Sequence, residues 1–212
     1  MRTQRQKWYA GETISLSIGQ GALTATPLQV ARAFAGLSLG GIWHRPHLTR
    51  EAGAKDKPVT WPLNAKNVSD VISGMYGVVN EGGTGVRAAI PGLRVCGKTG
   101  TAQVASNDFV KAHGHEGQDL KDNVWFVGFA PCEKPEIVVT AFFEHGFESK
   151  YACPIVRDVI KAYFDKKARN AMIQQQKDAL AINLQNVGSL GLASMMHPGS
   201  HAPISAARSG AN

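Results

Sequence analysis

The sequence predicts an α+β fold in which helices pack on an antiparallel sheet. Two segments with helical spacing of apolar residues occupy the first 80 residues, three strand-like runs follow between residues 93 and 143, and another helical pattern begins at Pro154. Helices that flank a block of consecutive strands, without alternating with them, are typical of an α+β layer. With 212 residues, 43% hydrophobic and 18% charged, the chain can bury a substantial core.

The first helix is expected to begin at Pro27. Thr26 and Gln29 form a capping box around a proline at the first helical position, and Gly40 with Gly41 ends the pattern. Its apolar face consists of Leu28, Ala31, Phe34, Ala35 and Leu39. We interpret this helix as structural.

A short edge strand within residues 42–48, interrupted by Pro46, and a loop over residues 55–62 come next. The second helix starts at about Ala65 and stops at Gly82. Its regularly spaced apolar positions are Val68, Val71, Ile72, Met75, Val78 and Val79. This stripe predicts a helix that packs on the core.

The strand block contains runs at residues 93–104, 124–129 and 137–143. The turn at residues 131–135 predicts that the last two runs form an antiparallel hairpin. The polar interval 106–123 is expected to be a mobile loop. A final helix over about residues 154–167 presents Ile155, Val159, Ile160 and Phe164 to the sheet.

Composition changes near the end of the chain and predicts two parts. Residues 1–170 are expected to form the domain, and residues 171–212 a tail that is partly helical and then disordered beyond about Val187. No apolar run approaches the length of a membrane span, and no apolar stretch follows the N-terminus to make a leader. Any membrane anchor is expected outside these residues.

The net charge of +7 allows a non-catalytic basic binding module, for nucleic acid or another anionic surface. The basic residues are scattered, whereas a nucleic-acid binder gathers them on one face, so we expect no nucleic-acid partner. The three cysteines are widely spaced and indicate neither a zinc knuckle nor a disulfide framework. We expect no metal and no cofactor.

The densest chemical pattern surrounds Lys98, and it fits two classes of protein. Gly92, four residues, and Gly97-Lys98-Thr99 match the P-loop of nucleotide-binding proteins. The intervening residues favour a strand, however, and Gly100 with Thr101 stands where the P-loop helix must begin. A P-loop NTPase therefore remains the alternative interpretation.

The other interpretation treats Lys98-Thr99-Gly100-Thr101 as a strand of the K-T-G type found in penicillin-binding proteins and serine β-lactamases. Lys98 supplies positive charge, Thr99 and Thr101 can donate hydrogen bonds to a carboxylate, and Gly100 lets a peptide backbone approach. Strand alternation puts Lys98 and the two threonines on opposite faces. The site must therefore lie along the strand edge, unless Gly100 twists the strand.

Longer stretches carry the same resemblance. They read GETISLSIGQGALTATPLQVARAFAGLSLGGIWHRPHL, GMYGVVNEGGTGVRAAIPGLRVCGKTGTAQV, NVWFVGFAPCEKPEIVVTAFFEHG and PIVRDVIKAYF, and they span about Gly11 to Phe164. The chain resembles the C-terminal half of the transpeptidase domain of class B penicillin-binding proteins, most of all the elongation type, penicillin-binding protein 2.

The resemblance implies a part of a peptidoglycan D,D-transpeptidase of cell-wall biosynthesis, which cross-links stem peptides and is acylated by β-lactams. It implies that Lys98 is the catalytic lysine of the third motif, and that Thr99, Gly100 and Thr101 bind substrate, with the Thr101 N–H in the oxyanion hole. The partners that the resemblance implies are cell-wall elongation proteins, which govern cell shape. The location that it implies is the extracytoplasmic (periplasmic) face of the inner membrane.

The chain departs from the family pattern in one respect that bears on activity. It contains neither Ser-x-x-Lys nor Ser-x-Asn, so the nucleophile, its activating lysine and the serine of the second motif are absent. In the family both motifs precede the segment that begins near Gly11. We therefore expect a fragment that needs the N-terminal half of the same domain, is inactive alone, and exposes an apolar sheet face.

Four further residues with metal-binding side chains have no supporting spacing. They are His113, His115, His145 and Cys153. We interpret the histidines as solvent-facing loop residues and Cys96 as a small buried residue.

Overall fold

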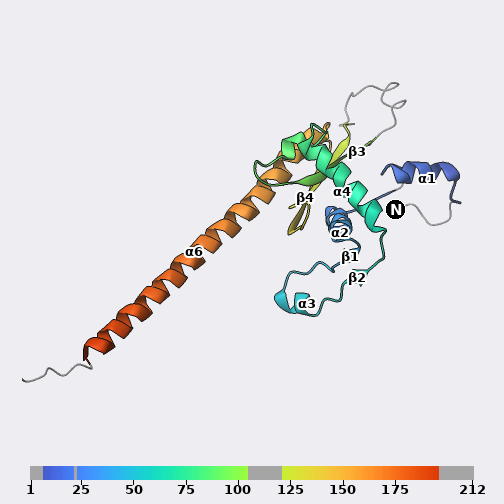
Figure 1. Cartoon of the computed structure of the whole chain (residues 1–212). Helices are drawn as coiled ribbons and strands as arrows, with labels where there is room; N and C mark the ends of the chain where they lie inside the picture. The colour runs from blue at the N-terminus through green and yellow to red at the C-terminus, as the bar shows by residue number, and fades with distance from the viewer. Residues whose placement is uncertain (1–6, 22, 105–120, 196–212) are drawn as a thin grey trace, which may run out of the picture. The chain divides into compact units, whose positions relative to one another are not determined.

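The computed structural model describes residues 7–21, 23–104 and 121–195, with side chains as far as residue 185. The chain divides into two units, residues 1–164 and 165–212, which are described separately. The first unit holds all strands of the described part together with five α-helices, the last of which continues into the second unit (Figure 1).

Three antiparallel strands form the main sheet in the order β3-β4-β5. They are β3 (Cys96–Ala102), β4 (Asn123–Ala130) and β5 (Ile137–Phe143). Lys98 pairs with Val127, which in turn pairs with Thr140. The hairpin expected between the last two runs is confirmed, and β3 lies at an edge of the sheet.

Helices α2 (Pro27–Ser38) and α4 (Ala65–Asn80) confirm the two helices expected before the sheet. In α2, the Thr26 N–H donates to Gln29 Oε1 at 2.8 Å, and the Gln29 N–H donates to Thr26 Oγ1 at 3.2 Å. This reciprocal pair satisfies two amides that have no partner within the helix. A short 3-10 turn, η1 (Val86–Ala88), follows α4.

Several small elements lie outside the sequence expectations. They are α1 (Ala10–Ser17), α3 (Arg50–Ala54), β2 (Val59–Thr60) and the 3-10 turn η2 (Ser149–Tyr151). The strand expected over residues 42–48 is only β1 (Ile42–Trp43), because Pro46 cannot continue a ladder. β1 pairs antiparallel with β2, so residues 55–62 are not wholly loop.

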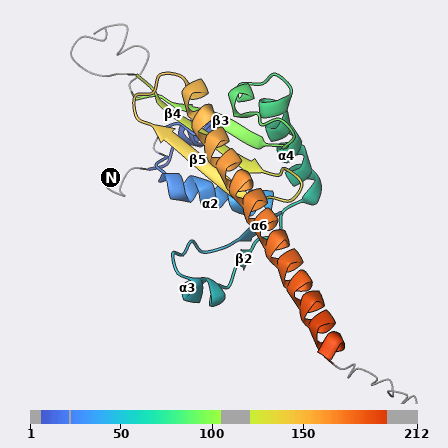
Figure 2. The same cartoon turned by 90° about the vertical axis from the view of Figure 1, so that its left-hand side faces the viewer.

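Both faces of the main sheet carry buried apolar residues. One cluster centres on Phe126 and includes Val156 and Ile160 from α6 (Ala152–Met195), whose first part, within the first unit, lies in front of the sheet in Figure 2. The other cluster contains Met75 of α4 and Phe129 of β4, with Phe34 of α2 packed against it. The expected core stripe of α4 is thus partly confirmed, since Met75 and Val79 are buried.

A disulfide joins Cys96, at the start of β3, to Cys132, just beyond the end of β4. Their Cα atoms are 5.4 Å apart. The spacing of the cysteines along the chain gave no indication of this bond. The strand pairing places the residues next to each other, because the Cys132 N–H donates to the carbonyl of Arg94, two residues before Cys96.

In the second unit, α6 continues to Met195. The sequence predicts a helix over about residues 154–167, followed by a tail that is partly helical and then disordered beyond about Val187. In the structure one helix continues through these residues to Met195. Residues 171–185 contain no glycine or proline and many glutamine, alanine and leucine residues, which favour helix continuation. The compact first unit ends at Phe164 rather than at residue 170. Residues 196–212 lie outside the described residues.

No helix in the described ranges is both long and apolar enough to cross a membrane. The expected mobile loop over residues 106–123 falls mostly on residues 105–120, which also lie outside the described residues.

Candidate functional site

The residues singled out around Lys98 lie in β3, an extended strand. The Lys98 ammonium donates to the carbonyl of Thr99 at 2.8 Å, and the hydroxyls of Thr99 and Thr84 are 2.8 Å apart. Within the described part of the chain no further strand pairs with the outer edge of β3, where the side chains of Lys98 and Gln20 reach the carbonyls of Thr99 and Thr101. This is the edge position that the sequence requires if Lys98 and Thr99 are to serve one site.

A cavity of about 400 Å³ adjoins this strand and is lined by Lys98, Thr99 and Gly100. The strand thus brings three of the four candidate residues to one space. Thr101 does not line the cavity and is exposed at the next position along the edge. Side chains of β4 and β5, among them Trp125 and Phe142, form an apolar wall. The ring centroids of Trp125 and Phe142 are 4.3 Å apart.

Gly100 lies directly opposite Trp125 in the ladder. A Cβ added at Gly100 would come within 3.3 Å of Trp125 Cβ, closer than such contacts normally are. Any larger side chain would therefore crowd the cross-strand neighbour and enter the cavity. The absence of a side chain keeps this part of the strand accessible to an extended ligand.

Lys98 is the one cation among the residues that line this cavity, and in the described ranges it makes no ion pair. Its charge is held near β3 by the hydrogen bond to the Thr99 carbonyl. An anionic group in the cavity would therefore meet an uncompensated positive charge beside hydroxyl donors. A carboxylate-bearing peptide has the matching chemistry.

The P-loop interpretation is wrong. A P-loop needs a compact loop after Gly92 and a helix that begins at Lys98. In the structure β3 runs without interruption from Cys96 to Ala102, and Gly97 pairs with Gly128 in the ladder. The backbone amides therefore follow a strand and do not converge on an anion.

Three residues that the sequence analysis missed support β3. The Gln20 side-chain amide donates to the carbonyl of Thr101 at 3.0 Å, and Thr84 contacts Thr99. The Asn80 side chain donates to the carbonyl of Val95 at 2.8 Å and so ties the end of α4 to the segment that enters β3.

One local signal could have drawn attention to Gln20. It stands between Gly19 and Gly21, both of which have φ near +75°, a conformation that favours glycine. A polar residue held between two such glycines is placed by the turn rather than by a regular element.

The remaining candidates for metal binding do not form a site in the described residues. The His145 N–H donates to Asn123 Oδ1 at 2.9 Å, which fixes the turn after β5. Burial raises the pKa of the Cys153 thiol to about 11, and its Sγ contacts the Ser149 carbonyl. His113 and His115 lie outside the described residues.

Comparison with known proteins gives one consistent result. Residues 2–161 match the family described as the penicillin binding protein transpeptidase domain. The chain is 38% identical over 193 residues to the peptidoglycan D,D-transpeptidase MrdA of Haemophilus influenzae, covering 82% of this chain and 30% of that protein. It is 36% identical over 186 residues to MrdA of Acinetobacter baumannii, covering 80% and 27%. The chain thus spans about a third or less of the curated relatives it matches.

Solved structures agree. The chain is similar to Pseudomonas aeruginosa PBP2 in complex with WCK 5153, with a TM-score of 0.61 and 34% identity over 76% of this chain and 34% of that one. It is also similar to Helicobacter pylori PBP2 in a complex with MreC, with a TM-score of 0.59 and 31% identity over 74% and 28% of the two chains. From its matching sequence, sheet and helices, this chain belongs to the penicillin-binding protein transpeptidase family.

Proposed function

We propose that this chain supplies the substrate-binding strand of a peptidoglycan D,D-transpeptidase. The observation that carries the proposal is the position of Lys98, Thr99 and Gly100 along an open sheet edge beside a cavity of about 400 Å³. A peptide can add to such an edge through main-chain hydrogen bonds. The substrate would be a stem peptide of peptidoglycan, and β-lactams would occupy the same edge.

Each residue of the strand has a role in this proposal. Lys98 contributes positive charge near the nucleophile and the substrate carboxylate, and Thr99 and Thr101 donate hydrogen bonds to that carboxylate. The Thr101 N–H donates to the oxygen that becomes negative when the carbonyl is attacked, which is a large stabilising term in acyl transfer. Gly100 allows the close approach of the peptide backbone.

The nucleophile must come from elsewhere, because the sequence contains no Ser-x-x-Lys. In the proposed reaction a serine oxygen attacks the carbonyl of the penultimate D-alanine, and the peptide bond to the last D-alanine breaks. An amine of a stem peptide on a neighbouring peptidoglycan strand then takes the acyl group, and the serine is released. We propose that the N-terminal half of the same domain supplies this serine, and that the chain alone is inactive.

Location and partners follow from the same proposal. Family members of this type act at the outer face of the inner membrane, and the Cys96–Cys132 disulfide suits an oxidising compartment. The Helicobacter pylori relative is known in a complex with MreC. We propose that cell-wall elongation proteins are partners of the protein to which this chain contributes.

Covalent labelling with a fluorescent penicillin tests the proposal. The 212-residue chain should show no label, whereas a longer protein that adds an upstream Ser-x-x-Lys segment should be labelled. Boiling the samples in detergent before electrophoresis distinguishes covalent from non-covalent binding. Labelling of the chain by itself, or no labelling of the longer protein when it is folded, would contradict the proposal.

A further inference from the structure

A second cavity, of about 340 Å³, lies between α2, β1 and β5 and has an apolar floor. Leu28, Ala31, Ala35 and Leu39 line it, and these residues of α2 and its C-cap belong to the apolar face that the sequence indicates. Two of them, Leu28 and Leu39, are 60% and 40% exposed. The apolar stripe of α2 therefore faces an open groove, which we call the α2 groove.

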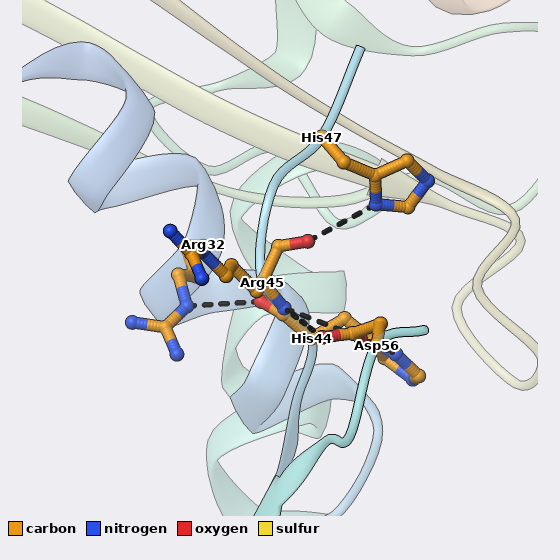
Figure 3. Close-up of polar contacts among 5 residues, drawn as sticks. All are labelled: Arg32, His44, Arg45, His47 and Asp56. Carbon is orange, nitrogen blue, oxygen red and sulfur yellow. Dashed lines mark hydrogen bonds and ion pairs between the residues drawn. The ribbon is translucent and has the colours of Figure 1, made fainter. Parts of the chain in front are cut away.

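The rim of the α2 groove is cationic. Arg32, His44, Arg45 and His47 line the cavity, and no acidic side chain does. Arg32 Nε donates to the carbonyl of His44 at 2.9 Å, which holds the guanidinium at the rim and leaves its terminal nitrogens as donors. The Arg45 guanidinium has no partner in the described part of the chain. Figure 3 shows both arginine side chains on the α2 side of this segment.

One acidic residue, Asp56, bonds to residues of this rim and is engaged within the loop. Asp56 accepts from His44 Nδ1 at 2.9 Å and from the Arg45 N–H at 3.3 Å, and its side chain is only 8% exposed (Figure 3). Asp56 thus holds the loop in place and is not available to neutralise the guanidinium groups. Arg32 and Arg45 line the rim with no acidic side chain among the lining residues, and guanidinium groups bind carboxylates through their N–H donors.

We propose that the α2 groove docks an acidic peptide segment of a partner protein, with an apolar side chain in the cavity and a carboxylate on Arg32 and Arg45. This function is separate from transpeptidation, because none of the groove residues lines the cavity beside Lys98. A peptide fits better than a membrane surface, since the apolar residues line a concavity that a side chain can enter and a flat bilayer cannot. The combination of apolar anchors and arginine is typical of peptide-binding grooves.

The probe for the test is a fluorescein-labelled peptide of alternating glutamate and leucine, and binding to the 212-residue chain is followed by fluorescence anisotropy. We expect a dissociation constant below about 1 mM that weakens when salt rises from about 50 to about 200 mM. The same peptide with glutamine for glutamate, or serine for leucine, should bind about tenfold more weakly.

Variants locate the site. Arg45→Glu should weaken binding by about tenfold or more, because it reverses the charge that the peptide carboxylate meets. The fold should be retained, because the Arg45 guanidinium makes no bond in the described part of the chain that the substitution could break. Leu28→Ser should weaken binding without a change in charge. The matched control is Lys134→Glu, an exposed residue that does not line the groove and carries the same charge change, and it should stay within about twofold of the parent. Circular dichroism and melting temperature confirm that each variant folds.

Four results would overturn the proposal. The peptide could fail to bind, or Lys134→Glu could weaken it as much as Arg45→Glu does. Vesicles of phosphatidylglycerol could bind in place of the peptide with the same dependence on Arg45, which would indicate a membrane surface. Binding could also disappear in a longer protein that includes the upstream half, which would show that the same chain covers the groove. None of these results depends on penicillin labelling, so failure here is distinguishable from failure of the proposed transpeptidase function.

Discussion

The two faces of the main sheet differ in how completely the chain covers them. On one face, Phe126 of β4 is fully buried against Val156 and Ile160 of α6. On the other, Trp125 and Phe142 line a cavity, and Phe142 is 39% exposed. The covered face is packed into a buried core, whereas Lys98 lies on the open face. Lys98 therefore lies where the described part of the chain leaves apolar surface for something else to pack against.

The largest expected effect comes from the covered face. Phe126→Ala should lower the free energy of unfolding by about 3–5 kcal/mol, because it removes a fully buried ring and leaves a cavity. Phe142→Ala is the matched change on the open face and should cost less than half as much. Urea unfolding measures both. If the two variants lose the same free energy of unfolding, the two faces are packed alike and the proposed difference between them is wrong.

The disulfide should have the next largest effect. It closes a loop across a sequence separation of 36, for which the chain-entropy argument gives about 3–4 kcal/mol. Cys132→Ser should lower the stability of the oxidised protein by this order, and reduction of the parent protein should have the same effect. The matched control is Cys153→Ser, which keeps the disulfide and should therefore lose stability on reduction as the parent does, whereas the stability of Cys132→Ser should not depend on the redox state. If reductant does not change the stability of the parent protein, the disulfide is not formed or does not stabilise the fold.

A smaller effect is expected at acidic pH. The hydrogen bond from His44 lowers the pKa of Asp56 below its ordinary value, so Asp56 stabilises the fold above that ordinary value. The stabilisation is lost as the pH falls through the lowered pKa. Asp56→Asn should therefore reduce the melting temperature at about pH 7 and have little effect at about pH 2. A constant difference across this range would contradict the assigned role.

The smallest effect is expected at the open sheet edge. Gln20→Ala removes one exposed hydrogen bond to the Thr101 carbonyl and should cost less than about 1 kcal/mol. Gln175→Ala, on the exposed part of α6, is the control and should have no effect on the first unit. Amide hydrogen exchange should become faster around Thr101 in the first variant alone. Unchanged exchange would mean that Gln20 does not hold the strand.

Much of the first unit could be predicted from the sequence because local signals agree with the tertiary structure. The Thr26–Gln29 capping box and the hairpin turn at residues 131–135 are local devices, and both elements form as expected. The position of Lys98 on an edge strand followed from chemistry, since a single site needs groups from both faces of the strand. The Gly-Lys-Thr-Gly pattern by itself could not decide between loop and strand.

The rest depends on contacts between distant residues. Cys96 and Cys132 meet because β3 and β4 pair, and Gln20 reaches Thr101 across 81 positions of the sequence. The spacing in α2 predicted an apolar face, and in the described part of the chain Leu28 and Leu39 on that face remain exposed. Periodicity shows that a helix has an apolar side, but it does not show which neighbour covers that side.

The rate of acylation by penicillin in the longer protein, with the upstream half present, tests the central claim most directly. Lys98→Ala should reduce the second-order rate constant by about a hundredfold or more, because it removes the positive charge beside the reacting groups. Lys66→Ala, an exposed lysine paired with Asp70 on α4, should leave the rate unchanged. If Lys98→Ala folds and is acylated at the parent rate, the β3 edge is not part of the site.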